Sequence, residues 1–341
     1  MGDAQMESNA RPLVSVVTPV YNGEPYLAEC IESVLAQTYP NWEYIVVNNC
    51  SKDRTLEIAR AYANKDSRIR VHDNQEFVGV IANHNIAFGL VSPESKYCKV
   101  VSADDWLLPE CLTMMVNLAE ANPGVGIVGS YQLSGGGSNW RNWRVRWAEL
   151  PYPNPVIPGR ELCRLQMLGG PYVFGTPTST LYRSDLVRRG NGFYPNALPE
   201  ADTSACYKCL QETDFGFVHQ VLSYERVHEN TISKTAKELN AYLPSKINDL
   251  LAYGSSCMTS SELENRLEQL LGDYYRMLAV GAVNLREKQF WTYHRGRLKE
   301  FGHPLSRLKL CKAIFLKVID LVLNPKQTAE ILWDRAKGHH A

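Results

Sequence analysis

The sequence predicts an α/β fold built on a mostly parallel, doubly wound sheet, and three observations carry this prediction. Apolar segments of strand length alternate with amphipathic segments of helix length between residues 13 and 108. Polar residues directly follow three of the strand segments, at Tyr21/Asn22, Asn48/Asn49 and Asp104/Asp105. The carboxyl ends of parallel strands meet at one edge of a sheet. These three loops should therefore line one crevice.

The strands and helices follow one another regularly. Leu13–Val20 is predicted as a buried strand, and the next helix carries Leu27, Cys30, Ile31, Val34 and Leu35 along one face. The same alternation predicts strands at 43–47, 69–71, 97–102 and 125–131, with helices after residue 53 and over 82–90. Further on we expect a strand near residues 180–183, a helix over 202–210 and a strand at 222–227.

Composition and charge exclude several classes of protein. The chain has 341 residues, 45% of them hydrophobic, which allows one large α/β domain with an appendage. Lys+Arg and Asp+Glu both number 36, so no excess of positive charge suggests a nucleic-acid partner. The nine cysteines are irregularly spaced, which argues against a disulfide framework and for a reducing compartment. Cys206 and Cys209 are interpreted as two thiols on one helix rather than as half of a zinc site.

The first twelve residues and the rest of the chain lack the features of a membrane or export signal. Residues 1–12 have no apolar core typical of a signal peptide, and no stretch is long and apolar enough to span a bilayer. We therefore expect a cytoplasmic protein, with the inner face of the cell membrane as an alternative site of action.

The segment Tyr97–Leu108 is the centre of the predicted site. An apolar strand stops at two adjacent carboxylates, Asp104 and Asp105, and Pro109 follows at a position suited to a first helical turn. Buried carboxylates are costly unless a charge offsets them, and a divalent cation is a common partner. Taken alone, an equally good interpretation is that these aspartates cap the next helix. The usual glycine-rich dinucleotide and phosphate-loop motifs are absent from the sequence, so a pyrophosphate would need another positive partner, such as a metal held by Asp104.

Several motifs recur in a familiar order. They are T-P-V-Y-N-G (18–23), C-I-E-S-V-L-A-Q-T-Y-P-N-W-E (30–43), the polar run 48–53 and S-A-D-D-W (102–106). In order and spacing this set resembles the family-2 glycosyltransferases with the GT-A fold over about residues 12–233. The resemblance implies an inverting, nucleotide-sugar-dependent transferase that uses Mg²⁺ or Mn²⁺.

The resemblance also implies which residues bind the nucleotide and the metal. The nucleotide would lie against Pro19, Tyr21, Asn48 or Asn49, Gly79 and Asp104, and the metal would be held by Asp104, with Asp105 and His228. Two positions depart from the family pattern. Asn48 and Asn49 replace a pair of aspartates, and Ser102 replaces the first carboxylate of the metal motif. An asparagine carbonyl can still accept a hydrogen bond from a uracil ring.

The acceptor side is assigned to the middle of the chain. A glycine-rich segment leads into alternating Trp and Arg, including Trp140 and Trp143, which could stack on sugar rings and close over a substrate. The same alternation also fits a strand with aromatics on one face. Thr178, with Thr176 and Ser179, is a further candidate for acceptor contact because the family places this region beside the acceptor.

Acids and histidines further along the chain complete the candidate set. Glu200 and Asp202 lie directly before a predicted amphipathic helix, and Asp202 could be a simple cap. The family places its general base just before this helix, so Asp202 is the candidate, with Glu200 as second choice. His228, in an Arg-x-His element, is a candidate for the metal or the diphosphate, and a surface or core histidine is the alternative. His84 is a weaker candidate near the nucleotide.

From about residue 235 the pattern is helical, with helices expected over 242–253, 261–283 and 304–323. We therefore predict a catalytic domain over residues 1–234 and a helical extension over 235–341. The last helix is amphipathic and basic, so it could contact an anionic membrane. Packing on the core or on a second subunit, as in a homodimer, is the alternative.

Taken together, these features predict transfer of a sugar from a nucleotide-diphosphate donor, a UDP-sugar, to a saccharide or lipid-linked acceptor in bacterial surface polysaccharide synthesis. Asp202 would take the proton of the acceptor hydroxyl. A non-catalytic nucleotide- or glycan-binding relative is the main alternative, motivated by the Asp-to-Asn pair. A sugar-phosphate nucleotidyltransferase is a third hypothesis, but it would need a glycine-rich basic loop after the first strand.

Overall fold

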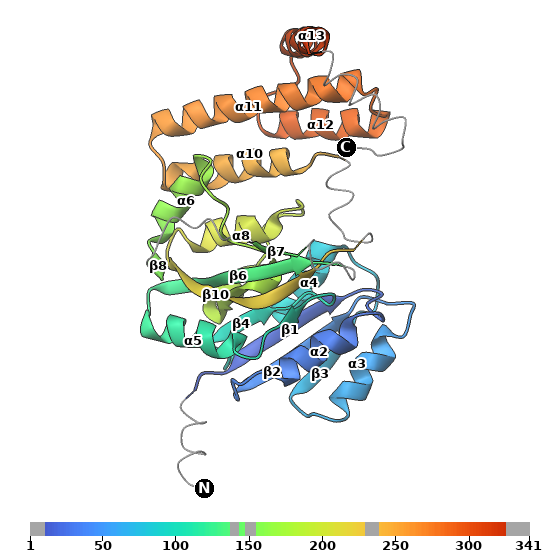
Figure 1. Ribbon diagram of the computed structural model, residues 1–341, viewed down its shortest axis with the longest axis vertical. Coiled ribbons are helices and arrows are strands. Elements are labelled where there is room, and N and C mark those ends of the chain that lie inside the picture. Colours follow the sequence, from blue (N-terminus) through green and yellow to red (C-terminus); the bar gives the residue numbers. More distant parts are fainter. Residues whose placement is uncertain (1–10, 137–142, 147–154, 229–238, 325–341) are drawn as a thin grey trace. The chain divides into compact units, whose positions relative to one another are not determined.

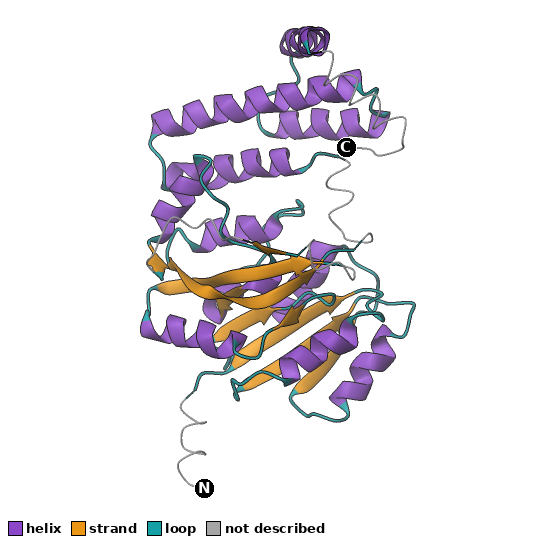
Figure 2. Ribbon diagram, viewed as in Figure 1, coloured by secondary structure: helices purple, strands orange, loops and turns teal. Residues whose placement is uncertain are grey.

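The computed structural model describes residues 11–136, 143–146, 155–228 and 239–324. The chain divides into two compact units, Met1–Ile232 and Ser233–Ala341. The first unit contains a mixed sheet with helices packed against it, and the described part of the second unit is helical (Figures 1 and 2). An α/β fold with a helical C-terminal region is what the sequence predicts, and this prediction is confirmed.

One half of the sheet is parallel. β1 (Val14–Val20) lies between β2 (Trp42–Asn48) and β4 (Tyr97–Val100), and β3 (Ile69–Asp73) pairs with the outer edge of β2. Because β2 and β4 lie on opposite sides of β1, the strand order reverses at β1 and β4. The carboxyl ends of these two strands are therefore the point at which open α/β sheets bind ligands.

The other half of the sheet is mixed. β9 (Thr180–Arg183) runs antiparallel between β4 and β6 (Val125–Gly135), and β10 (Asp214–Arg226) runs parallel to β6. The sequence predicts a strand that starts at residue 222, whereas β10 starts at Asp214 and has register shifts between Val218 and Ser223. Three short antiparallel strands complete the sheet: β5 (Trp106–Leu107), β7 (Arg144–Arg146) and β8 (Val156–Ile157).

Helices bury both faces of the parallel half. One hydrophobic cluster joins alternate strand residues, such as Val14, Val16 and Val46, to α2 (Leu27–Leu35), α3 (Thr55–Ala63) and α5 (Cys111–Ala121). The intervening residues, such as Val17 and Ile45, are equally buried but lie outside that cluster, as expected of a sheet covered on both sides. The remaining helices of this unit are α4 (Val80–Gly89), α6 (Gly159–Met167), α7 (Ser184–Val187) and α8 (Ala201–Cys209).

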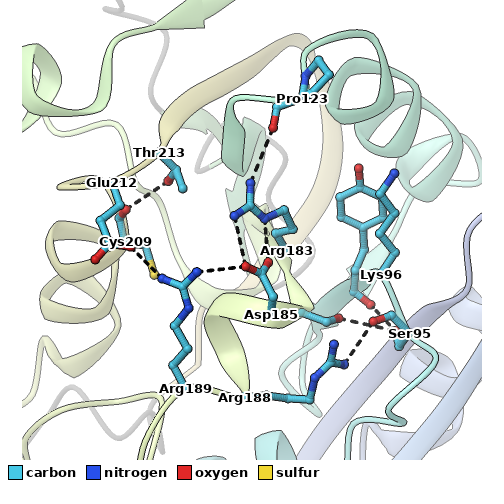
Figure 3. A network of polar contacts seen from close by, with 12 residues as sticks. Ser95, Lys96, Pro123, Arg183, Asp185, Arg188, Arg189, Cys209, Glu212 and Thr213 are labelled. Atoms are coloured by element: carbon cyan, nitrogen blue, oxygen red, sulfur yellow. Dashed lines mark hydrogen bonds and ion pairs between the residues drawn. The ribbon is translucent and has the colours of Figure 1, made fainter.

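A polar network fastens β9 and α7 to the amino end of β4 (Figure 3). Arg183 makes a bidentate pair with Asp185 at 2.6 and 3.0 Å, and Arg189 joins Asp185 to Glu212 beyond α8. Arg188 donates to the carbonyls of Ser92 and Ser95, just before β4 begins. These ion pairs lie at the opposite end of β4 from Asp104, so they brace the sheet away from the ligand edge.

The second unit contains four α-helices among its described residues: α10 (Tyr242–Tyr253), α11 (Ser260–Val283), α12 (Lys288–Glu300) and α13 (Arg307–Leu323). Thr259 and Glu262 form a capping box at the start of α11. His294 of α12 is buried between the hydroxyl of Tyr274, at 2.7 Å, and the carbonyl of Leu239, at 2.9 Å. Helices α10 and α11 confirm the predicted ranges to within one residue, whereas α12 is not among the predicted helices.

Two findings concern the whole described chain. Among the described residues, no helix has the length and apolar character needed to cross a membrane. All nine cysteines are free thiols, and Cys206 and Cys209 are both buried on α8, as the interpretation of this pair as two thiols on a helix expects.

Candidate active site

The loop after β4 presents Asp104 and Asp105 at the ligand edge of the sheet. They do not cap the next helix, because β5 intervenes and the residue at the N-cap of α5 is Glu110, which makes no capping bond through its side chain. Pro109 correspondingly lies before α5 rather than in its first turn. The interpretation of Asp104 and Asp105 as simple caps of the next helix is therefore wrong.

Asp104 lies beside His228, from the far end of the first unit. Oδ2 of Asp104 is 3.0 Å from Nε2 of His228, and the side chains are 33% and 22% exposed. The His228 ring lies 5.3 Å from the ring of Tyr26. Two of the predicted metal residues therefore meet, although they are 124 positions apart in the chain.

Asp105 faces a different set of partners. It is 5% exposed, and its two carboxylate oxygens accept hydrogen bonds from Thr178 Oγ1 (2.6 Å) and from the backbone N–H of Arg226 (3.0 Å). Burial, together with the neighbouring Asp104 charge, raises the pKa of Asp105 to about 8. Asp105 thus fastens the Asp104 loop to η2 (Pro177–Ser179) and to the end of β10.

The described residues contain no group of three or more His, Cys, Asp or Glu that could hold a metal ion by itself. A carboxylate and an imidazole still suit a divalent cation that takes its remaining ligands from water and phosphate oxygens, as Mg²⁺ and Mn²⁺ sites in nucleotide enzymes often do. The donor set therefore fits the predicted metal with Asp104 and His228 as protein ligands.

Thr178 supports the loop that carries Asp104 and Asp105, here called the carboxylate loop, through hydrogen bonds to Ser102 and Asp105. It is fully buried, and besides bonding Asp105 its hydroxyl lies 3.1 Å from the backbone N–H of Ser102 and 3.2 Å from the Ser102 hydroxyl. The sequence analysis proposes Thr178 as an acceptor contact. In the structure it presents no surface to an acceptor, and its hydroxyl positions Asp105 and Ser102 instead.

Lys99 is a residue that the sequence analysis misses. It is fully buried in β4, and its Nζ donates to the carbonyls of Thr178 (2.5 Å) and Thr180 (3.0 Å). Burial lowers the pKa of Lys99. A lysine inside the apolar run 97–101 is the signal that could have revealed it, because a buried ammonium needs acceptors nearby.

Arg226 is the second missed residue. Its guanidinium lies 4.5 Å from the Tyr26 ring and 5.0 Å from the Trp106 ring, and its Nε donates to the carbonyl of Asp104 at 3.1 Å. A further bond joins Nη2 to Glu29 of α2 at 2.5 Å. Arg226 therefore holds the end of β10, and with it His228, against the Asp104 loop. The Arg-x-His motif contained this signal, but its arginine was not used.

Hydrogen bonds join the loop after β1 to the loop after β2. Asn22 has a left-handed backbone with φ of 51°, its N–H donates to Ser51 Oγ, and its side-chain oxygen accepts from the N–H of Lys52, both at 2.9 Å. Tyr21 is 44% exposed and meets the ring of Phe77 edge-on at 4.9 Å. Pro19 is buried within β1. This leaves the Tyr21 and Phe77 rings as the exposed surface at this end of β1.

Asn48 and Asn49 are almost fully buried and bonded within the protein. Asn49 accepts from the N–H of Val78 (3.0 Å) and donates to its carbonyl (2.8 Å). Asn48 donates to Asp73 Oδ1 at 2.8 Å. These bonds shape the segment that ends at Gly79, the residue before α4, where a Cβ would meet no atom within 4 Å. The two asparagines thus hold the segments that follow β2 and β3, and their contact with a base stays a prediction.

Asp202 lies in a second polar region, at the start of α8. It is the second residue of that helix, and the N-cap position belongs to Glu200, whose side chain makes no capping bond. Oδ1 of Asp202 accepts from the N–H of Thr203 at 2.9 Å. Burial raises the pKa of Asp202 to about 6, although this hydrogen bond opposes the shift. A carboxyl that titrates near neutral pH is suited to general-base catalysis.

Tyrosines surround Asp202. Burial, with a contribution from the Asp202 charge, raises the pKa values of Tyr172, Tyr182 and Tyr194. His84 of α4 stacks on Tyr194 at 5.4 Å and has its pKa lowered by burial. The side chain of Asn85 bonds both the N–H and the carbonyl of Tyr194. Helix α4, which starts directly after Gly79, therefore also positions the surroundings of Asp202.

Trp143 lies on the outer side of the carboxylate loop. It is 41% exposed, and its ring meets Tyr224 edge-on at 5.3 Å, while Tyr224 stacks on Trp106 at 3.7 Å. Residues 144–146 form β7, so the strand interpretation holds for that part of the Trp/Arg segment. Trp140 lies outside the described residues.

Comparison with known proteins identifies the family. The model of "Glycosyl transferase family 2" matches residues 15–190, just over half of the chain. A glycosyltransferase of Haemophilus influenzae is 38% identical over 120 residues, which are 35% of this chain and 36% of that protein. TuaG of Bacillus subtilis, whose name provisionally assigns it to teichuronic acid biosynthesis, is 39% identical over 98 residues, 29% of this chain and 38% of TuaG. The matched part thus spans a little over a third of each of these relatives.

Solved structures share the fold. TarS residues 1–349 of S. aureus, in complex with UDP-GlcNAc, aligns with a TM-score of 0.61 at 17% identity, over 84% of this chain and 80% of that chain. The mannosyltransferase PcManGT of Pyrobaculum calidifontis, in complex with GDP-Man and Mn²⁺, aligns with a TM-score of 0.53 at 16% identity, over 92% of this chain and 89% of that chain. At these identities the alignments establish the architecture, and the predicted GT-A fold is confirmed. From the family match, the chain belongs to glycosyl transferase family 2.

Proposed function

We propose that this protein is an inverting glycosyltransferase that moves a sugar from a UDP-sugar to a hydroxyl group of a saccharide or a lipid-linked acceptor. The observation that carries the proposal is that one unit contains two aspartates, Asp104 and Asp202, in different surroundings. Asp104 meets His228 at the switch point of the sheet, while Asp202, with a pKa raised to about 6, lies among tyrosines at the start of α8. A donor diphosphate and an acceptor hydroxyl need these two different environments.

The donor half of the proposal rests on the loops after β1, β2 and β4. Tyr21 and Phe77 offer aromatic edges and faces on which a base can stack, and the segment shaped by Asn49 brings Gly79 to the same edge. Asp104 and His228 would hold Mg²⁺ or Mn²⁺ against the diphosphate. When bound, such a metal offsets the charge that develops on the departing nucleotide. The UDP-GlcNAc and GDP-Man complexes of the structural neighbours support a nucleotide-sugar donor.

The acceptor half rests on Asp202. Its carboxylate would accept the proton of the attacking hydroxyl, and the oxygen would attack the anomeric carbon opposite the nucleotide, so that the configuration inverts. Trp143 and Trp140 would contact the acceptor. Relatives such as TuaG support a role in bacterial surface polysaccharide synthesis.

The test is calorimetric titration of UDP into the protein, with and without Mn²⁺, repeated with Asp104→Ala. Metal-dependent binding that is lost in the variant supports the donor site. A screen of UDP-sugars with a panel of saccharide acceptors then tests transfer. UDP binding that does not depend on metal would contradict the proposed metal site, and absence of binding to UDP, GDP and dTDP would contradict the donor class.

A non-catalytic nucleotide- or glycan-binding protein is the second candidate. The observation in its favour is that Asn48 and Asn49 are buried and bonded within the chain, which leaves their polar atoms engaged before any base arrives. Donor turnover separates the two functions. Release of UDP from a UDP-sugar, even by slow hydrolysis, would eliminate the non-catalytic alternative if Asp202→Asn abolishes it.

A further inference from the structure

The two sides of α13 differ sharply in what covers them. Leu310, Ala313, Ile314, Lys317 and Leu321 are partly covered on the side that packs against α11. Asp320, the acidic residue of this helix, pairs with Lys317 at 2.7 Å and therefore has its charge offset within the helix. In Figure 1 α13 is seen end-on beside α11, at the edge of the helical unit. No residue of α13 is fully buried.

The uncovered side of α13 is mostly apolar, and apolar residues run along its whole length. Leu308, Phe315 and Val322 follow one another at intervals of seven residues and are 82%, 65% and 72% exposed. At 100° per residue they lie on one line, and neighbouring positions widen it to a broad stripe. The other exposed residues of the stripe are Cys311, Leu316, Val318, Ile319 and Leu323. Isolated monomers in water seldom leave a contiguous apolar surface of this size uncovered.

The charges beside the stripe are mostly positive. Arg307, Lys309 and Lys312 are exposed in the first two turns, near Leu308 and Cys311. The acidic residue of the helix, Asp320, has a side chain that is 44% exposed, but it is paired with Lys317. Positive charge beside a wide apolar stripe matches a surface that combines anionic groups with hydrocarbon, as the interface of an anionic bilayer does.

We propose that α13 is a membrane-docking helix, which lies in the plane of an anionic lipid surface with its apolar stripe among the acyl chains. The helix has 17 residues and basic groups near one end, so it suits the interface rather than a span. A second copy of the chain is a poorer occupant. A symmetric contact with parallel helices would bring the basic residues of both copies together. An antiparallel contact would place them against the apolar second half of the partner helix, where Asp320 is already paired with Lys317. The proposal concerns the second unit alone and does not depend on the proposed transferase activity.

The test is co-flotation of the full-length protein with vesicles of phosphatidylcholine alone or mixed with phosphatidylglycerol. We expect binding to the anionic vesicles, weakened by salt. Phe315→Asp/Val322→Asp should weaken it at least about a hundredfold, because each variant places a charge among acyl chains. Lys309→Gln/Lys312→Gln should weaken it about fivefold for each charge removed. Leu285→Asp is the matched control: Leu285 is 88% exposed in the same unit but lies outside α13, so binding should be unchanged.

Cys311 allows a second readout in the otherwise unchanged protein. Cys311 is exposed, whereas Cys50 and Cys257 are half-buried and the other six cysteines are buried, so an environment-sensitive dye should react with Cys311 first. The emission of the dye should shift to the blue on addition of anionic vesicles and stay unchanged with phosphatidylcholine alone. Thermal unfolding of each variant shows whether the fold is retained, because substitutions on an uncovered face should leave it intact.

Three outcomes would overturn the proposal. A dimer in analytical ultracentrifugation that Phe315→Asp/Val322→Asp converts to a monomer, together with no vesicle binding, would make the stripe an interface between copies. Binding that appears only in a variant ending at Asn324 would mean that residues 325–341 cover the stripe. Equal binding of the wild-type protein and Phe315→Asp/Val322→Asp to vesicles would place the contact elsewhere on the chain.

Discussion

Asp104 and Asp202 belong to the same unit, but opposite kinds of side chains surround them. Asp104 lies beside His228, and Arg226 donates a hydrogen bond to its backbone carbonyl. Thr178 donates to the neighbouring Asp105, and Lys99 in turn donates to the carbonyl of Thr178. Cationic and donor groups therefore lie around the carboxylate loop. Asp202 has tyrosines and Cys206 around it, and no cation contributes to its pKa within the described part of the chain. One region brings hydrogen-bond donors and a cation to a partly exposed carboxylate, whereas burial raises the pKa of the carboxyl in the other.

This difference explains how one unit can supply two kinds of carboxylate chemistry. A partly exposed carboxylate beside an imidazole can take a cation, whereas a carboxyl in a desolvated region binds a proton more readily. The distinction follows from the neighbours rather than from the residue type. Experiments that exchange or remove those neighbours therefore test the assignment of both aspartates.

The largest expected effect comes from the Asp202 side. Asp202→Asn keeps the shape and the hydrogen bond from Thr203 but removes the proton acceptor, so the transfer rate should fall by about 10²–10⁴-fold. Nucleotide binding, measured by calorimetry, should stay within about twofold. Glu200→Gln is the matched control and should retain most of the activity. The reverse pattern, with Glu200→Gln inactive and Asp202→Asn active, would move the base to Glu200.

The second effect isolates the Asp104 side. Asp104→Ala should weaken Mn²⁺-dependent UDP binding by at least about tenfold, because one of two proposed protein ligands is lost. His228→Gln, which removes the other, should have a smaller effect of the same kind. Calorimetry with a series of Mn²⁺ concentrations measures both. If Asp202→Asn reduced metal-dependent binding as strongly as Asp104→Ala, the separation of the two regions would be wrong.

The third prediction concerns the support of the carboxylate loop. Thr178→Val keeps the side-chain volume but leaves Asp105 and Ser102 without their hydroxyl partner, and should lower the free energy of unfolding by about 1–3 kcal/mol. Thr113→Val on α5 removes an exposed hydroxyl contact and should change the free energy of unfolding by less than about 0.5 kcal/mol. Urea denaturation measures both. Equal, small effects would show that Thr178 does not support the loop.

The smallest effect is a pH dependence specific to Asp202. Because the carboxylate must be unprotonated to accept a proton, the rate of transfer should fall to about half as the pH drops to about 6. Stability should move in the other direction. Folding raises this pKa above the ordinary value of an aspartic acid, 3.8, so the stabilising contribution is complete below about pH 4 and is lost as the pH rises through 6. A rate profile with no acidic limb near pH 6 would contradict the assignment.

Much of the parallel half could be predicted from the sequence, because its signals are local. Strand segments such as Leu13–Val20 and the helix stripe from Leu27 to Leu35 are buried on a regular period, and the structure has them within a residue. The polar strand ends also indicated one edge of the sheet, since parallel strands place their carboxyl ends together. Local pattern was enough there.

The parts that sequence reasoning missed depend on distant neighbours. The roles of Lys99 and Arg226 require carbonyls and rings that approach from residues 79 to 200 positions away, and no periodicity reports these. Thr178 is assigned to the acceptor from the family resemblance, and nothing local in the sequence reveals that its hydroxyl bonds Asp105. The antiparallel insertion of β9 between β4 and β6 likewise depends on pairings that only the folded chain contains.

The asparagine pair after β2 has a consequence for covariation in the family. Asn48 gives its amide hydrogen to the Asp73 carboxylate, and Asn49 gives its own to the carbonyl of Val78. An aspartate at either position would place a negative oxygen against another oxygen. Replacing Asn48 or Asn49 alone by aspartate should therefore be unfavourable. Position 48 should therefore change together with position 73 in relatives. Tyr21 and Phe77, which contact each other through their rings at the same edge, are not restrained by this pair of bonds.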